Sequence, residues 1–511
     1  LTPYSLLLTF HEVPSTPIFN KRRCIINVMV YKRLVFILLL VMLAACLPIP
    51  TVQLDPAVPP VSFRISPSSV QIDYISLPGY NEPSTPDEYD KALYLRYFLP
   101  GDTPGTVLVL VPGIFGGATS VDILARQLVA ATPGLEVWAV DRRANLLEDL
   151  SALQTGLKTR NPEGVYDYYV TNYGTETGFE AIPPEDVRFM VDWGLEVHLR
   201  DLHEIVKRAK VTAPRVILAG HSLAGSIVGY YAAFRFPDGA GYTHLDGLVL
   251  IEGALGRTGG FDREPKGLNL GPLELIPGIE GLREGRGSPY LTLGFRPQFY
   301  ARREAMAMLA RFAPDELFTG DIFDFPLTNR AALGIGESNL YGPSTVFSST
   351  LGNATNAVFG GNLTAVILAG GQGIYSRSVV AVAEGKEFVD WDETGAISDI
   401  DEVAQSWTNA YTNRSEWYFP IRLALDIGQY DVSLENTPDF IPNRLVTVPT
   451  LAVGGGRGLA QTLEAFSAYS NARVGSLFSS YVIPGFTHLD IVQATNNPLV
   501  GIFQAWLNQI P

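Results

Sequence analysis

The stretch Val216-Ile217-Leu218-Ala219-Gly220-His221-Ser222-Leu223-Ala224-Gly225 decides the fold. Its four apolar residues, 216–219, predict a buried strand, and residues 226–233 predict a helix directly after the turn. A serine on such a sharp strand-to-helix turn lies in a strained position at the edge of a sheet. Small residues must flank it, because strand and helix approach closely there, and Gly220 and Ala224 are small. The alternative is that Ser222 only caps the helix.

This segment resembles the nucleophile elbow of the α/β-hydrolase superfamily, whose commonest motif has glycine where this chain has Ala224. The resemblance implies an α/β-hydrolase fold, which is a mostly parallel central sheet flanked by helices. It also implies that Ser222 is the nucleophile of a serine hydrolase, followed in the chain by an acid and then a histidine.

A second candidate element precedes the elbow. Residues 106–111 are all β-branched or aliphatic and predict a fully buried parallel strand. The loop after them, Pro112-Gly113-Ile114-Phe115-Gly116-Gly117, resembles the oxyanion loop of the superfamily, with proline in place of histidine. This implies that backbone N–H groups of Ile114 or Phe115, with that of Leu223, bind a developing oxyanion. A plain strand-to-helix loop is the alternative. A helix should begin near Thr119, with Asp122 completing a capping box.

Further patterns predict the rest of the sheet and its helices. Strands are expected at 70–77, 92–98, 135–140, 247–252, 449–454 and 480–482, and helices at 196–208, 298–312, 406–425 and 498–507. Asp141 and Arg142 follow one of these strands. We interpret them as a structural ion pair; the alternative is that they support the active-site residues.

Two long insertions interrupt this pattern. Roughly 190 residues separate Glu252 from the strand at 449–454, too many for a plain connection. They resemble the cap or lid that many α/β hydrolases carry after the sixth strand. We therefore expect a core formed by 68–254 and 447–511 and a cap formed by 255–446. A second insertion, 146–191, is rich in tyrosines, which favours packing or the wall of a substrate cleft.

Of the histidines, His488 is the best candidate for the general base. The chain has six: His11, His198, His203, His221, His244 and His488. Only His488 follows the last predicted strand, on a loop that could reach the serine. We expect the elbow to turn His221 away. His198 and His203 are five residues apart on one helix, which does not suit a pair of metal ligands, so both are interpreted as ordinary helix residues.

The acid of the expected serine, acid and histidine triad has more than one candidate in this sequence. Many members of the superfamily carry an aspartate after the seventh strand, but this chain has Gly454-Gly455-Gly456-Arg457-Gly458 there. Some members place the acid after the sixth strand, where this chain has Glu252. We predict Glu252 as the acid, with Glu464 and Asp490 as alternatives, and expect Asp490 to hold the histidine loop through backbone hydrogen bonds.

The N-terminal region predicts export. Lys32-Arg33 precede the apolar run 34–43, which leads to Leu43-Ala44-Ala45-Cys46. The ending resembles a bacterial lipobox, which implies lipidation at Cys46. We predict a signal peptide at 1–45, with 1–28 as an extension ahead of a start at Met29, and a lipid-anchored tether at 46–67. An ordinary signal peptide or an uncleaved anchor is the alternative.

Composition narrows the function further. The formal net charge of -15 excludes a nucleic-acid surface, and the two cysteines, Cys24 and Cys46, exclude a thiolate metal site in the body of the chain. We expect a membrane-anchored, extracytoplasmic serine hydrolase of an ester or lipid substrate, with no metal or cofactor. Peptidase, acyltransferase or perhydrolase chemistry on the same triad, and a catalytically inactive binding lipoprotein, remain alternatives.

Overall fold

The computed structural model describes residues 62–256, 267–270, 273–292, 296–341, 348–359, 380–473 and 475–510. The chain falls into two compact units, Leu1–Leu47 and Pro48–Pro511, and all described residues belong to the second. The predicted signal peptide, Cys46 and most of the tether therefore lie outside the described residues. Within these ranges, no helix has the length and apolar character that crossing a bilayer requires.

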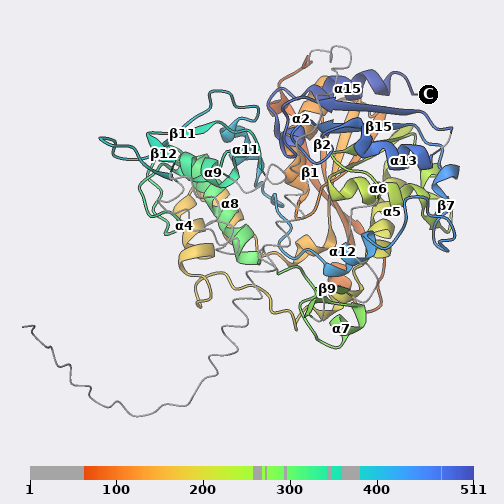
Figure 1. The fold of residues 1–511 in the computed structure, drawn as a ribbon, viewed down its shortest axis with the longest axis horizontal. Coiled ribbons are helices and arrows are strands. Elements are labelled where there is room, and N and C mark those ends of the chain that lie inside the picture. Colours follow the sequence, from red (N-terminus) through yellow and green to blue (C-terminus); the bar gives the residue numbers. More distant parts are fainter. Residues whose placement is uncertain are drawn as a thin grey trace, which may run out of the picture. The chain divides into compact units, whose positions relative to one another are not determined.

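An eight-stranded sheet is the centre of the described structure (Figure 1). Its strand order is β1-β2-β4-β3-β5-β8-β15-β16; β2 pairs antiparallel with β1 and β4, and every other pairing is parallel. The strands are β1 (Gln71–Pro78), β2 (Lys91–Phe98), β3 (Thr106–Val111), β4 (Leu135–Asp141), β5 (Arg215–His221), β8 (Gly247–Ile251), β15 (Thr450–Gly455) and β16 (Phe478–Ile483). Each strand predicted from an apolar run is present, and the predicted mostly parallel sheet is confirmed.

Helices cover both faces of this sheet. Helices α2 (Asp122–Ala131) and α15 (Pro498–Leu507) share a hydrophobic cluster with one face, and α5 (Leu195–Thr212) and α6 (Leu223–Ala233) share another cluster with the opposite face. Strand β5 contributes alternate side chains to the two clusters, Val216 to one and Ile217 to the other. This two-sided burial explains why the central strands are continuous apolar runs.

A third hydrophobic cluster unites the two insertions. It joins α3 (Ser151–Thr159) and α4 (Pro162–Tyr166) to α8 (Pro297–Phe312), α9 (Asn329–Glu337) and α11 (Ile400–Ser406). The insertion tyrosines Tyr166 and Tyr169 are buried in it. Several buried residues near the end of the long insertion instead join the cluster around α5 and α6; they include Phe419, Leu423, Ile427, Leu434 and Phe440. Segments far apart in sequence therefore build one packed body beside the sheet.

The remaining elements are short. They are η2 (Pro67–Ser69), η3 (Asp87–Tyr89), η4 (Ala118–Val121), η5 (Arg143–Leu147), η6 (Asp167–Thr171), η7 (Arg188–Asp192), β6 (Arg235–Phe236), β7 (Gly239–Ala240), η8 (Gly241–His244), β9 (Gly267–Leu270), β10 (Leu273–Pro277), α7 (Ile279–Arg283), β11 (Asn353–Thr355), β12 (Ala357–Phe359), β13 (Val380–Val382), β14 (Asp390–Asp392), α12 (Ile421–Ile427), η10 (Asn443–Leu445), η11 (Leu463–Phe466), α13 (Ser467–Ala472) and α14 (Asp490–Gln493).

Two helix predictions are wrong. The expected helix at 406–425 is two separate helices, because α11 ends at Ser406 and α12 begins only at Ile421. The segment between them is irregular, and its backbone forms hydrogen bonds to other parts of the chain. The Ser415 N–H, for example, donates to the Glu304 carboxylate. The capping box is also absent, since Asp122 is the first residue of α2 and pairs with Arg126.

Candidate active site

Ser222 occupies a strained turn between β5 and α6. Its φ is 59° and its ψ is -125°, a left-handed conformation that is rare for a residue other than glycine. The turn fits only because glycines surround it: a Cβ on Gly113 would lie 2.8 Å from Cβ of Ser222, and a Cβ on Gly253 would overlap the Ser222 carbonyl oxygen. Ser222 makes no side-chain cap hydrogen bond to α6, so it is not a plain N-cap. The local geometry is that of a nucleophile elbow.

His488 and Glu252 form a buried pair beside this turn. His488 Nδ1 lies 2.7 Å from Glu252 Oε2, and the two side chains are almost fully buried. Glu252 follows β8, and His488 lies on the loop between β16 and α14. The structure thus brings together three predicted residues from distant parts of the sequence: Ser222, Glu252 and His488.

The glycine-rich stretch after β15 holds the Glu252 carboxylate. Oε1 accepts hydrogen bonds from the N–H groups of Gly455 (2.5 Å) and Ala460 (3.3 Å), and Oε2 accepts one from Leu459 (2.6 Å). At Gly458, a Cβ would overlap this carboxylate. The segment after β15 therefore supplies backbone donors to a carboxylate that follows the neighbouring strand, β8.

The two alternative acids lie in other environments. Asp490 Oδ2 accepts a hydrogen bond from the Thr487 N–H (2.9 Å), and its Oδ1 accepts one from the Thr350 N–H (2.8 Å). It thereby ties the histidine loop to the long insertion, and the expected backbone hydrogen bond is confirmed. Glu464 is exposed on η11. Of these three carboxylates, Glu252 is the one bonded to His488.

The expectation that the elbow turns His221 away is wrong. Its ring centroid lies 4.6 Å from that of His488, and its Nε2 is 3.1 Å from the His488 carbonyl oxygen. Burial lowers the pKa of His221 well below its ordinary value, so the ring is neutral and its Nε2–H donates to that carbonyl. His221 thus braces the backbone of the histidine loop. Its place at the end of β5 was the available signal, because strand ends meet at this edge of the sheet.

Arg142 holds the predicted oxyanion loop, and the predicted ion pair with Asp141 is wrong. The buried guanidinium donates to the carbonyls of Pro112 (2.8 Å), Gly113 (2.8 Å) and Gly116 (3.0 Å), and it pairs with Glu416. Asp141 instead accepts hydrogen bonds from the Ala118 N–H and the Thr412 hydroxyl. Consecutive side chains at a strand end point in opposite directions, which separates these two neighbours.

Ser222 and His488 line one cavity of about 80 Å³. Ile114 and Phe115 of the predicted oxyanion loop line it as well, and Leu223 is the first residue of α6, next to Ser222. Phe115 has a φ of 58°, a second left-handed non-glycine residue at this edge. The cavity therefore brings a serine, a histidine and a backbone loop held by Arg142 into one small space.

The long insertion also contributes side chains to the lining of this cavity. Tyr300, Arg303 and Arg414 line it. The Arg303 guanidinium pairs with Glu337, and the Arg414 guanidinium stacks 4.1 Å over the Trp407 ring. Burial lowers the pKa of Arg414 to about 10, so the group still carries its charge at neutral pH. Among the described residues, Arg414 Nε has no hydrogen-bond partner.

The strand order, the elbow and a histidine after the last strand together make this an α/β-hydrolase fold. No protein-family model and no curated protein matches the sequence. Solved structures do match. A protein assigned as a lipase from Sulfolobus solfataricus aligns over 86% of this chain and 95% of its own, at 15% identity and a TM-score of 0.46. A peroxisomal alpha-beta-hydrolase from Saccharomyces cerevisiae aligns over 86% and 88%, at 13% identity and a TM-score of 0.39. An alpha/beta hydrolase fold protein from Nakamurella multipartita aligns over 86% and 98%, at 14% identity and a TM-score of 0.35.

Proposed function

We propose that this protein is a serine hydrolase that cleaves carboxylic esters through an acyl-enzyme. The main support is one constellation: Ser222 on a strained elbow shares a cavity with His488, whose Nδ1 lies 2.7 Å from the buried carboxylate of Glu252. In this proposal Ser222 is the nucleophile, His488 the general base and Glu252 the orienting acid.

The proposed reaction gives each of these residues one role. Ser222 Oγ attacks the ester carbonyl while His488 Nε2 takes the hydroxyl proton, and the protonated ring then returns it to the departing alcohol. A water molecule repeats the sequence on the acyl-serine, releasing the acid and the free serine. Glu252 keeps Nδ1 protonated, so that Nε2 is the basic nitrogen. The N–H of Leu223 and that of Ile114 or Phe115 are the proposed oxyanion donors.

The nucleophile, the base and the acid are tested with three single variants and one double variant. Ser222→Ala and His488→Ala should each lower esterase kcat about 10³-fold or more, and the double variant should be little worse, since the residues act as a unit. Glu252→Gln should also lose most of the rate, because the amide can stabilise the wrong imidazole tautomer.

Ser226, on the helix α6 that follows Ser222, provides the matched control. Ser226 donates to the Ala254 carbonyl and lies outside the cavity lining, so Ser226→Ala should retain normal turnover. Fluorophosphonate labelling should occur in the parent and disappear in Ser222→Ala. Near-normal turnover in Ser222→Ala or His488→Ala would remove that residue from the mechanism. No labelling of the folded parent would favour the inactive binding protein.

The bond that is cleaved is a separate question. Peptidase, acyltransferase and perhydrolase chemistry use the same triad. A panel of esters and amides, each with water, an alcohol or hydrogen peroxide as acyl acceptor, separates them. We favour ester hydrolysis. We further propose that 255–446 acts as a cap that selects the substrate, because Tyr300, Arg303 and Arg414 come from it.

We also propose that the protein is exported and lipid-anchored at Cys46. The support is the basic, apolar and small-residue order of 32–46 in the sequence. This would place an esterase at a membrane surface, which suits an ester or lipid substrate.

A further inference from the structure

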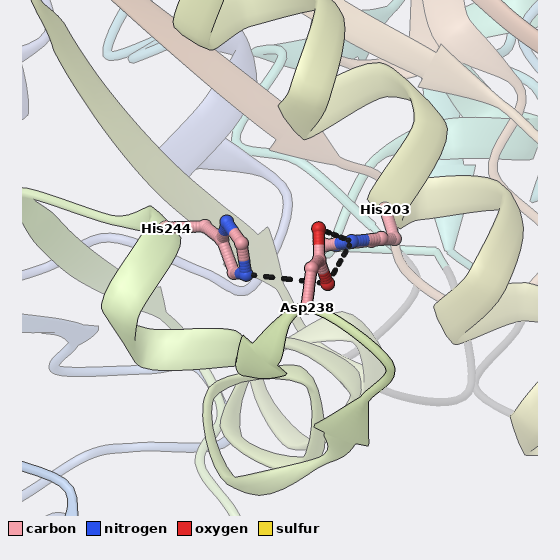
Figure 2. Close-up of side chains that lie close together, drawn as sticks. All are labelled: His203, Asp238 and His244. Atoms are coloured by element: carbon pink, nitrogen blue, oxygen red, sulfur yellow. Dashed lines mark hydrogen bonds and ion pairs between the residues drawn. The ribbon is translucent and has the colours of Figure 1, made fainter.

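Two histidines and an aspartate from separate elements converge at a site that the proposed esterase chemistry does not use (Figure 2). His203 comes from α5, Asp238 from the turn between β6 and β7, and His244 from η8. In Figure 2 the Asp238 carboxylate lies between the two imidazole rings. His203 was expected to be an ordinary helix residue because His198 is not on its face; its neighbours come instead from a different part of the chain.

The distances suit a single ion. His203 Nε2 lies 3.1 and 3.2 Å from the two Asp238 oxygens, and His244 Nε2 lies 3.6 Å from Asp238 Oδ1. All three ligand atoms lie within 4.8 Å of one another. Tetrahedral zinc, with bonds of about 2.0–2.1 Å, needs ligand atoms about 3.4 Å apart. Small side-chain rotations of Asp238 and His244 would bring the set to that spacing.

The surroundings of His203 fix its ring for such a role. Its Nδ1 lies 2.9 Å from the Tyr231 hydroxyl, and its ring stacks on Phe236 with centroids 3.9 Å apart. A partner on the far ring nitrogen is the usual way in which proteins orient a metal-binding histidine.

The ion pairs among these three side chains leave one ring nitrogen, His244 Nε2, without a hydrogen bond to any described residue. His244 Nε2 is buried and has no hydrogen-bond partner among the described residues, because 3.6 Å to Asp238 is too long for a hydrogen bond. A buried, unpartnered ring nitrogen that faces a carboxylate and a second imidazole is accounted for by an ion between them. Asp238 is about half exposed, so solvent can reach the site and supply a further ligand.

We propose that His203, Asp238 and His244 bind one Zn²⁺, with water as the fourth ligand. Two imidazole nitrogens and one carboxylate form a donor set typical of zinc, whereas Ca²⁺ and Mg²⁺ prefer all-oxygen sites. The site follows the C-terminal end of α6, whereas Ser222 precedes its N-terminal end; the 11 residues of this helix span about 16 Å. The ion therefore has a structural role: it ties α5 to the β6–β7 turn.

The experiment measures zinc binding and thermal unfolding on the purified full chain, without a histidine tag and after treatment with a chelator. Zn²⁺ should raise the unfolding midpoint of the parent, and Mg²⁺ or Ca²⁺ at the same concentration should not. Asp238→Asn and His244→Gln should each weaken zinc binding about 10-fold or more and abolish most of the shift. Glu204→Gln is the control: Glu204 lies on α5 beside His203, and its carboxylate pairs with Lys207. This variant should leave the zinc affinity and the thermal shift unchanged.

The variants at Asp238 and His244 decide the outcome, because His203 is packed against Phe236 and its replacement can disturb folding. Zinc affinity and a thermal shift equal to those of the parent in both variants would overturn the proposal, as would the absence of binding in the parent. Zinc held by Cys24 or Cys46 would persist in the variants and is thereby distinguished. Neither readout involves ester turnover, so this proposal and the proposed function fail independently.

Discussion

At the scale of single residues, Arg414 carries the clearest information about the substrate. It is a nine-tenths buried cation in the same cavity as Ser222, and its nearest carboxylate partner, Glu337, is 3.9 Å away and already paired with Arg303. A charged group with this little compensation would be stabilised by an anion entering the cavity. We therefore expect the proposed esterase to prefer esters that carry a carboxylate or phosphate near the scissile bond.

Two nitrophenyl esters of similar size test this preference. The parent should hydrolyse the anionic hemisuccinate with a higher kcat/KM than the neutral butyrate. Arg414→Gln should lower kcat/KM for the anionic ester about 10-fold or more, as expected for the loss of a charge-assisted hydrogen bond, and change the neutral ester little. An equal loss on both esters would instead mean that Arg414 serves only packing against Trp407.

At the scale of elements, the oxyanion loop depends on Arg142. This side chain donates to three carbonyls of the loop and to Glu416 of the insertion, so it fixes the backbone that carries the proposed oxyanion donors. Lysine cannot reproduce the planar fork. Arg142→Lys should therefore lower kcat about 10²-fold with a much smaller change in KM, since misplaced oxyanion donors affect mainly the transition state.

Arg143 is a matched control for this positioning role. It is equally buried and pairs with Asp90 and Asp201, but it makes no hydrogen bond to the loop in the described structure. Arg143→Lys should lower the unfolding midpoint as Arg142→Lys does, without the matching fall in kcat. Parallel losses of kcat in the two variants at equal stability would contradict the role given to Arg142.

At the scale of the whole molecule, the proposed lipid anchor sets where the hydrolase acts. Cys46→Ser should block processing of the N-terminal segment or release the protein from the membrane fraction, because a serine cannot carry the thioether-linked lipid. Cys24→Ser is the matched control and should fractionate as the parent does, since it lies upstream of the apolar run. Identical processing and fractionation of Cys46→Ser and the parent would contradict lipidation at this residue.

The sequence by itself determined the sheet and the elbow. Runs such as 106–111 and 216–219 are apolar on both faces, and only a strand buried between two helix layers needs that pattern. The small residues around Ser222 are likewise a local requirement of the turn. Chain order was also the basis for predicting His488 as the base and for ranking Glu252 ahead of Glu464 and Asp490, and the structure pairs His488 with Glu252.

Only the tertiary structure decided which distant side chains meet. The cradle around Glu252, the hydrogen bond from His221 to the His488 backbone and the clasp of Arg142 on the oxyanion loop join residues from different elements. The same holds for Arg414 in the active-site wall and for His203 beside Asp238 and His244. Such contacts arise where separate elements pack against one another, so they produce no repeating pattern along the chain. Sequence patterns predict each element, but they do not predict how the elements pack together.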